Sequence, residues 1–137
     1  MSKRSRVREV VLQILYQEDL NPDSDIRISE EFLRGRLKHN EKLIEFGRGL
    51  LIGVRQHRKD IDEQLAEFTD NWSLARMAVT DRNVIRLGAF EILHGGTPGR
   101  VAINEAVELA KRFGSKQSPQ FVNGILDRFL KLFTKDN

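Results

Sequence analysis

The sequence predicts an all-α fold, in which short amphipathic helices pack around one buried helix over about residues 80–94. Apolar side chains recur at intervals of three and four residues in most segments, which is the spacing of a helical face. No stretch shows the strict alternation of a half-buried strand. The segment 80–94 is apolar on every side when it is drawn as a helix, so other helices have to surround it.

This central helix has recognisable ends. Thr80 is a good N-cap, Asp81 follows in the first turn, where the helix dipole favours negative charge, and Gly95-Gly96 closes the far end. Arg82 and Arg86, on adjacent turns, leave a narrow polar seam near the start. We interpret the helix as core, and the two arginines either as side chains that reach solvent from its edge or as part of a binding surface.

The first helix is expected over residues 5–20. Tyr16 lies on a second, partly apolar face, opposite the main stripe of this helix. Its ring either packs on another helix or stands beside the preceding arginines, the combination that single-stranded RNA recognition uses. The main apolar stripe consists of Val7, Val10, Val11, Ile14 and Leu15.

Three further helices are expected before the central one. The first begins with Ser29 as its N-cap, the second covers about residues 40–56, and the third covers residues 60–68. Gly49 and Gly53 share one face of the second helix and would let a neighbouring helix come close, although each glycine weakens the helix by about 1 kcal/mol.

A short helical turn over residues 72–77 leads into the central helix. The only tryptophan, Trp72, is expected to fill the junction between two groups of helices. The His57-Arg58-Lys59 patch separates two of the preceding helices and is interpreted as a break between them.

Two helices are expected after the central one. The first covers residues 101–113 and ends at Gly114 in a left-handed conformation. Ser118 is then the N-cap of the last helix and Pro119 its first residue. Phe121 lies at the edge of the apolar face of that helix, so it is either additional core or a contact surface.

The positive charge is concentrated at the N-terminus. The chain has 23 basic and 20 acidic residues, and Lys3, Arg4, Arg6 and Arg8 all precede the first acid, Glu9. The remainder, with 19 basic and 20 acidic residues, is nearly neutral. A basic arm on a neutral body is typical of polyanion binding, and a solvated, disordered terminus is the alternative.

Several classes of protein are disfavoured. There is no cysteine, no apolar run of about 20 residues and no signal peptide, so a cytoplasmic protein without a membrane span is expected. His39, His57 and His94 lack metal-ligand spacing, and no catalytic motif is present. We therefore expect no metal, no cofactor and no enzymatic activity, and favour a single binding domain.

Several segments resemble the NusB family of bacterial transcription antitermination factors. The longest is Val-Ala-Ile-Asn-Glu-Ala-Val-Glu-Leu-Ala-Lys-Arg-Phe-Gly over residues 101–114, followed by Phe-Val-Asn-Gly-Ile-Leu-Asp over residues 121–127. Residues 85–91 resemble the central helix of the family, and the arginine-rich start that runs into Leu15-Tyr16 resembles its opening helix. The resemblance covers essentially the whole chain.

The resemblance implies two small helical bundles packed around the central helix. It also implies binding of boxA RNA from ribosomal RNA operon transcripts together with NusE, a ribosomal protein of the small subunit. NusA, NusG and RNA polymerase would complete the antitermination complex. The chain would be one RNA-binding domain over residues 1–137, with residues 1–8 as a basic arm. A NusB-like domain also occurs fused to ribosomal RNA cytosine methyltransferases. This chain ends at Asn137 with no methyltransferase domain, so the free-standing factor is expected.

The family pattern also implies individual site residues. Two departures occur: Ser5 splits the arginine run, which favours fewer phosphate contacts, and Gln117 is neutral where the family is often acidic, which should repel RNA less. The residues implied for RNA are Lys3, Arg4, Arg6, Arg8, Tyr16, Lys116, Gln117 and Phe121, and those implied for NusE are Asp81, Arg82 and Arg86.

Replacement of Arg6 or Arg8 by alanine is predicted to weaken RNA binding without unfolding the protein. Three alternatives remain open: a protein–protein adaptor with a merely solvating arm, a homodimer that buries its RNA face, and a small RNA-processing enzyme.

Overall fold

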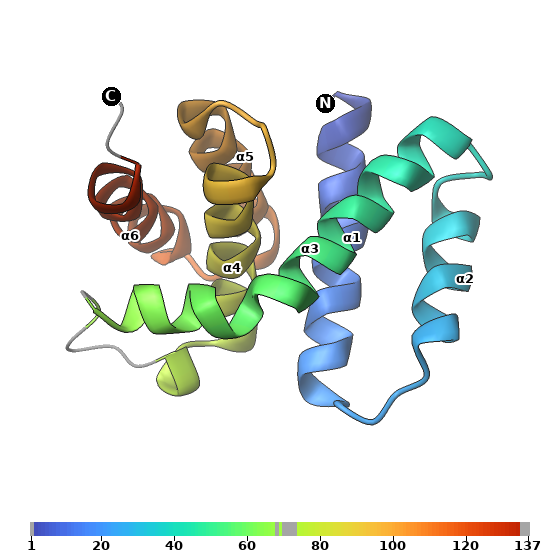
Figure 1. Cartoon of the computed structure of the whole chain (residues 1–137), viewed down its shortest axis with the longest axis horizontal. Coiled ribbons are helices and arrows are strands. Elements are labelled where there is room, and N and C mark those ends of the chain that lie inside the picture. The colour runs from blue at the N-terminus through green and yellow to red at the C-terminus, as the bar shows by residue number, and fades with distance from the viewer. Residues whose placement is uncertain (1, 68, 70–73, 135–137) are drawn as a thin grey trace.

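The computed structural model describes residues 2–67, 69 and 74–134, and within them it is all-helical, as predicted (Figure 1). One group of helices comprises α1 (Lys3–Leu20), α2 (Ile26–Arg36) and the first part of α3 (Glu41–Ala66). A single 3₁₀ turn, η1 (Leu74–Arg76), then precedes the second group, which comprises α4 (Val79–His94), α5 (Gly99–Phe113) and α6 (Ser118–Phe133).

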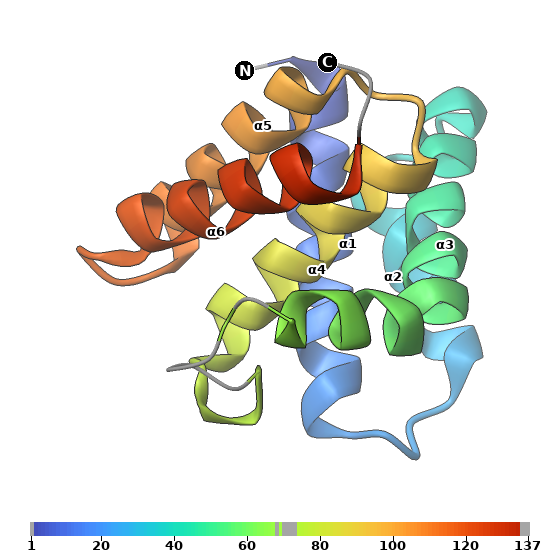
Figure 2. The same ribbon diagram turned by 60° about the vertical axis from the view of Figure 1, so that its left-hand side comes forward.

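Helix α4 is the buried centre of the molecule, which confirms the prediction. All nine residues from Asn83 to Glu91 are buried. Four helices pack around α4, namely α1, α3, α5 and α6 (Figures 1 and 2). The buried side chains of both groups form one continuous apolar cluster, so the two bundles share a core.

Helix α3 is one continuous helix of 26 residues, whereas the sequence predicted two helices separated at residues 57–59. The prediction was wrong because a charged patch without proline or glycine does not interrupt helical hydrogen bonding. The His57 ring stacks on the His94 ring of α4 with 3.9 Å between their centroids, and Arg58 points to Asp62 one turn later. The helix therefore crosses from the first group to the second (Figure 1).

The two glycines expected to share a helix-packing face behave differently. A Cβ atom at Gly53 would lie 2.1 Å from the Phe90 ring of α4, so this position requires glycine for the close approach. Gly49 faces open space. Only one of the two glycines therefore serves the contact that was predicted for both.

Several helix ends differ from their predicted positions by a few residues. Asp25 caps α2 by accepting a hydrogen bond from the backbone N–H of Arg27, and the predicted cap Ser29 lies inside that helix. Helix α4 begins at Val79 without a side-chain cap, so Thr80 is its second residue. Trp72 lies outside the described residues.

The link between α5 and α6 also differs from the prediction. Gly114 is extended, with φ −97° and ψ −166°, and does not adopt the left-handed conformation. Ser118 is already the first helical residue of α6 and is buried. Its hydroxyl accepts a hydrogen bond of 2.8 Å from the backbone N–H of Ser115, which holds the link closed from within.

Candidate nucleic-acid interface

The predicted basic arm is the first part of α1. Ser2 caps this helix by accepting a hydrogen bond from the backbone N–H of Ser5. Lys3, Arg4 and Arg6 are exposed. The guanidinium of Arg4 lies over the Phe46 ring of α3 at 4.4 Å from its centroid, and Arg6 contacts Glu9 at 3.3 Å. These cations are therefore held on an ordered helix, which lowers the entropy cost of binding a ligand.

Arg8 is not an accessible arm residue, contrary to expectation. Only 5% of its side chain is exposed, and it donates two hydrogen bonds of 2.8 Å to the carboxylate of Glu91 on α4. Thr97 donates a third hydrogen bond to that carboxylate. Burial lowers the pKa of Arg8, but hydrogen bonding and the negative charges of Glu91 and Glu105 outweigh it and raise the pKa overall. Arg8 thus fastens α1 to α4.

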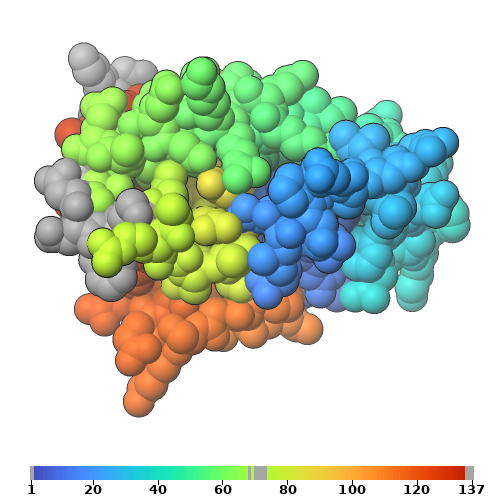
Figure 3. Space-filling model, turned by 90° about the horizontal axis from the view of Figure 1, so that it is seen from below, coloured from blue at the N-terminus to red at the C-terminus, as the bar shows by residue number. Residues whose placement is uncertain are grey.

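Tyr16 stands at the other end of α1, with 40% of its surface exposed. It lines a pocket of about 260 Å³ together with Leu12, Gln13, Thr80 and Phe113. The pocket therefore lies where the second half of α1, the start of α4 and the end of α5 meet, on the face seen in Figure 3. A half-exposed ring at the mouth of an apolar pocket is suited to stacking on a base.

Phe113 is a residue of this site that the sequence did not reveal. Helical spacing alone gives it a place at the edge of the apolar face of α5, and the structure shows it half-buried in the Tyr16 pocket. Phe121, the second ring predicted for RNA, is half-buried against the core and does not line that pocket. Phe113 and Phe121 differ from core residues only in being partly exposed. Helical periodicity does not reveal the degree of exposure, so the sequence could not distinguish them from the core.

The link before α6 presents polar groups beside this region. Lys116 and Gln117 are exposed, and the backbone carbonyl of Gln117 accepts a hydrogen bond from the N–H of Phe121. Figure 3 shows this end of α5 and α6 projecting from the body next to the start of α4. The link and the pocket thus lie at one end of the molecule, while Lys3 and Arg4 lie at the start of α1.

Arg82 and Arg86 belong to a network that joins three helices. Both contact the carboxylate of Asp19 at the end of α1, Arg82 at 2.7 Å and Arg86 at 3.2 Å. Arg86 is buried and also donates two hydrogen bonds to Asp62 of α3. Burial alone would raise the pKa of Asp19. Hydrogen bonds from Arg82 and Asn83 and the charges of Arg82 and Arg86 outweigh it and lower that pKa to about 2.

Asp81 differs from its two arginine neighbours. Its Oδ1 atom is buried, and it has no hydrogen-bond partner among the described residues. A buried acceptor without a partner is costly, typically by about 1–3 kcal/mol. Asp81 directly follows Thr80 in α4 but does not itself line the Tyr16 pocket.

The described part of the chain shows neither a metal site nor a membrane span. No group of three histidine or carboxylate side chains there could hold a metal ion. No helix there is both long enough and apolar enough to cross a bilayer.

Comparison with known proteins gives consistent results. The model of the NusB family matches residues 5–131. The transcription antitermination protein NusB of Anaeromyxobacter dehalogenans is 42% identical over 127 residues, which are 93% of this chain and 89% of that protein. NusB of Desulfitobacterium hafniense is 42% identical over 137 residues, which are 98% and 92% of the two chains.

Solved structures share the fold. NusB of T. maritima superposes with a TM-score of 0.85 at 38% identity, covering 94% of this chain and 91% of that one. A chain from the crystal structure of the antitermination factors NusB and NusE in complex with dsRNA has a TM-score of 0.79. At 23% identity, covering 96% and 98% of the two chains, this second likeness shows the fold alone.

Proposed function

Because the chain belongs to the NusB family, we propose that it acts as a transcription antitermination factor that binds RNA together with NusE. The observation that supports this role most strongly is the match, over nearly the whole chain, to relatives named transcription antitermination protein NusB. A protein of the same fold has been crystallised as NusB with NusE and double-stranded RNA, which supports the same two kinds of partner here.

The proposed RNA ligand is the boxA element of ribosomal RNA operon transcripts, bound as a single strand. The exposed cations Lys3, Arg4 and Arg6 would contact phosphates, as would Lys116 on the link before α6. Tyr16 would stack on a base, because its ring is half-exposed above an apolar pocket. Gln117 and Phe121 would also contact the RNA. The contribution of Arg8 would be indirect, through the position of α1.

The proposed NusE surface is centred on Asp81. The half-buried side chain of Asp81, at the start of α4, would contact NusE there. Arg82 and Arg86 would contribute indirectly, because both pair with Asp19 and hold the end of α1 against α4. NusE would thereby bind at the start of α4.

The larger assembly follows from this role. The complex of chain, RNA and NusE would join NusA, NusG and RNA polymerase in the cytoplasm. The chain would serve there as a binding component, without catalysis, as one RNA-binding domain over residues 1–137. In the absence of partners it would be able to form a homodimer that covers the RNA face.

A mobility-shift assay with a boxA RNA tests the proposal. The chain should retard this RNA more strongly when NusE is present, and a scrambled RNA of equal length should be bound less. A chain that binds NusE but no RNA would instead be an adaptor. Shortening of the RNA during the assay would indicate a processing enzyme. Light scattering of the free chain and of its mixture with NusE then distinguishes a homodimer from the heterodimer.

A further inference from the structure

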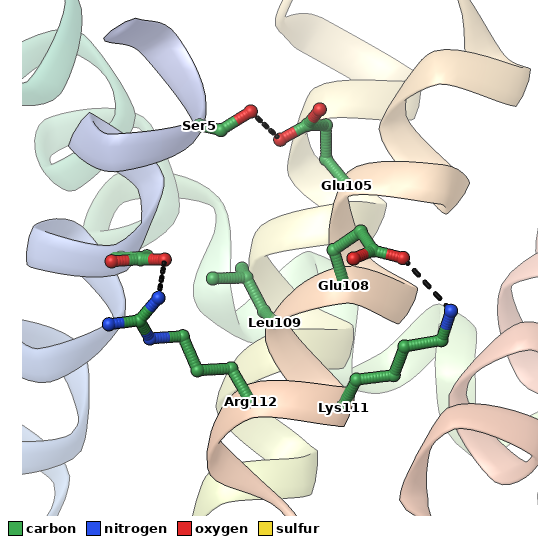
Figure 4. A pocket seen from close by; sticks show the side chains of 7 residues that line it. Ser5, Glu105, Glu108, Leu109, Lys111 and Arg112 are labelled. Carbon is green, nitrogen blue, oxygen red and sulfur yellow. Dashed lines mark hydrogen bonds and ion pairs between the residues drawn. The ribbon is translucent and has the colours of Figure 1, made fainter. Parts of the chain in front are cut away.

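A pocket of about 410 Å³ lies between α1 and α5, and none of the RNA residues predicted from the sequence lines it (Figure 4). Helices α1 and α5 run side by side in the same direction along it. Ser5 of α1 donates a hydrogen bond to Glu105 of α5, and further along Glu9 of α1 pairs with Arg112 of α5. The lining residues are Ser5, Glu9, Glu105, Glu108, Leu109, Lys111 and Arg112.

The unusual feature of the pocket is a carboxylate shared by two arginines. Arg6 approaches one oxygen of Glu9 at 3.3 Å, and Arg112 approaches the other at 3.4 Å. Only 5% of the Glu9 side chain is exposed, against 46% for Arg6 and 54% for Arg112. One buried negative charge therefore anchors two half-exposed positive charges.

The other acids of the pocket have polar or charged partners of their own. Glu108 pairs with Lys111 at 3.1 Å, and both side chains are exposed (Figure 4). Glu105 accepts the hydrogen bond from Ser5 and lies 3.5 Å from Arg8. Two guanidinium groups therefore share one carboxylate at Glu9, whereas two carboxylates, Glu91 and Glu105, share the single guanidinium of Arg8.

Both guanidinium groups have capacity for a further ligand. Each uses a single nitrogen, Nη1, for Glu9, and the remaining two nitrogens of each have no hydrogen-bond partner among the described residues. Arginine forks of this kind suit the oxygen atoms of a phosphate, which they bind with two parallel hydrogen bonds. Because Glu9 holds each group by one nitrogen, the guanidiniums are positioned without being saturated.

We infer that Arg6 and Arg112 together bind one backbone phosphate of single-stranded RNA. This inference rests on the proposed function and adds a binding residue to it, namely Arg112 of α5. The neighbouring Phe113 lines the Tyr16 pocket, so a strand that stacks on Tyr16 passes Arg112 on its way to the start of α1. Arg112 thus joins the two ends of the candidate interface, which the sequence had left apart.

The salt dependence of RNA binding by Arg112→Gln tests the inference. For a single-stranded ligand, each phosphate contact contributes about −0.7 to the slope of log K against log salt. We expect Arg112→Gln to reduce the steepness of this slope by about 0.7, which corresponds to a roughly fivefold loss of affinity at 0.1 M salt. Arg112→Lys should recover part of the slope, because it keeps the charge and loses the fork.

Arg27→Gln is the matched control. Arg27 is likewise an exposed arginine paired with a carboxylate, that of Asp25 at 2.8 Å, but it lies on α2 outside the candidate interface. The slope of log K against log salt for Arg27→Gln should equal that of the unmodified chain. Circular dichroism melting confirms that each variant is folded.

The outcomes separate the inference from the proposed function. If the unmodified chain binds no boxA RNA with or without NusE, the proposed function fails. If it binds, and Arg112→Gln keeps the slope of the unmodified chain, the phosphate site is refuted while the function stands. A lower melting temperature with an unchanged slope would show that Arg112 serves only to neutralise Glu9.

Discussion

The guanidinium of Arg8 and the carboxylate of Glu91 form a two-hydrogen-bond pair, both bonds 2.8 Å long, inside the contact between α1 and α4. Both side chains are at least 95% buried. A paired buried charge is tolerated because its partner replaces water, whereas a single buried charge is not. The arginine run at the N-terminus therefore serves two purposes, since Arg8 is structural while Arg4 and Arg6 remain at the surface.

Arg8→Ala is expected to destabilise the fold by about 3–5 kcal/mol, because it leaves Glu91 charged and buried without its partner. Urea unfolding followed by circular dichroism measures the loss. Arg4→Ala, the control on the same helix, should change the unfolding free energy by less than about 1 kcal/mol, since Arg4 is exposed and only stacks on Phe46. The double variant Arg8→Met with Glu91→Leu should be more stable than Arg8→Ala. Equal stability of Arg8→Ala and Arg4→Ala would contradict the buried-pair interpretation.

Asp19 should make the stability of the protein depend on pH in the acid range. The pKa of Asp19 is lowered from 3.8 to about 2 in the folded state, so the carboxylate stabilises the fold above pH 3.8 and this contribution is lost as the pH falls towards 2. The shift corresponds to about 2 kcal/mol. Asp19→Asn should therefore be less stable than the unmodified chain at pH 7, with a difference that shrinks between pH 4 and 2.

Urea titrations at a series of pH values measure this difference. Asp23→Asn is the control, because Asp23 is an exposed carboxylate in the turn after α1. A deficit of Asp19→Asn that is independent of pH would mean that the loss arises from packing and not from charge.

His94 should add a second pH dependence at higher pH. Burial lowers its pKa below 6.5, and the stacked His57 lowers it further, whereas the charge of Asp60 acts in the opposite direction. The folded state thus favours neutral His94. Its stabilising contribution is complete above pH 6.5 and declines as the pH falls through the lowered pKa. His94→Gln should flatten this part of the stability profile, and His39→Asn in the exposed turn before α3 should leave it unchanged. NMR titration of the His94 ring measures the pKa directly, and a value above 6.5 would refute the assignment.

The two glycines of α3 provide a matched pair for packing. Gly53→Ala would place a methyl group against the Phe90 ring and should cost about 1–3 kcal/mol from overpacking. Gly49→Ala should stabilise the protein by up to about 1 kcal/mol, because it improves helix propensity in open space. Thermal melting of both variants decides the point. If both substitutions change the melting temperature alike, the close approach of α3 and α4 does not require glycine at position 53.

The fold was predictable from sequence because helical periodicity is strong in every segment. A helix as uniformly apolar as α4 leaves only the central position open to it. The continuity of α3 was not predictable, since the side chains of His57 and Arg58 acquire their partners, His94 and Asp19, only through the tertiary structure. The predicted helix ends were wrong where capping depends on the local backbone. Helix α2, for example, is capped by Asp25 and not by the predicted Ser29.

The candidate interface was predictable only in its composition. Sequence places Arg6 and Arg8 two residues apart, and nothing in their spacing shows that one faces solvent while the other is enclosed by Glu91. Arg112 and Phe113 could not be recognised either, since their significance arises from contacts with Glu9 and the Tyr16 pocket more than 90 residues away in the chain. A signal was present in the juxtaposition of two basic residues and an aromatic at 111–113, but it matches the polar and apolar faces of an ordinary amphipathic helix equally well.

The unbroken course of α3 also determines how the molecule can respond to its partners. Both bundles are built onto the same 26-residue rod, and no flexible joint lies between them in that segment. Opening or closing one bundle against the other would require bending a helix clamped at Gly53 and at the His57–His94 stack. The protein should accordingly present its surfaces at fixed relative positions, so that any conformational adjustment on assembly falls to the RNA and to the partner protein.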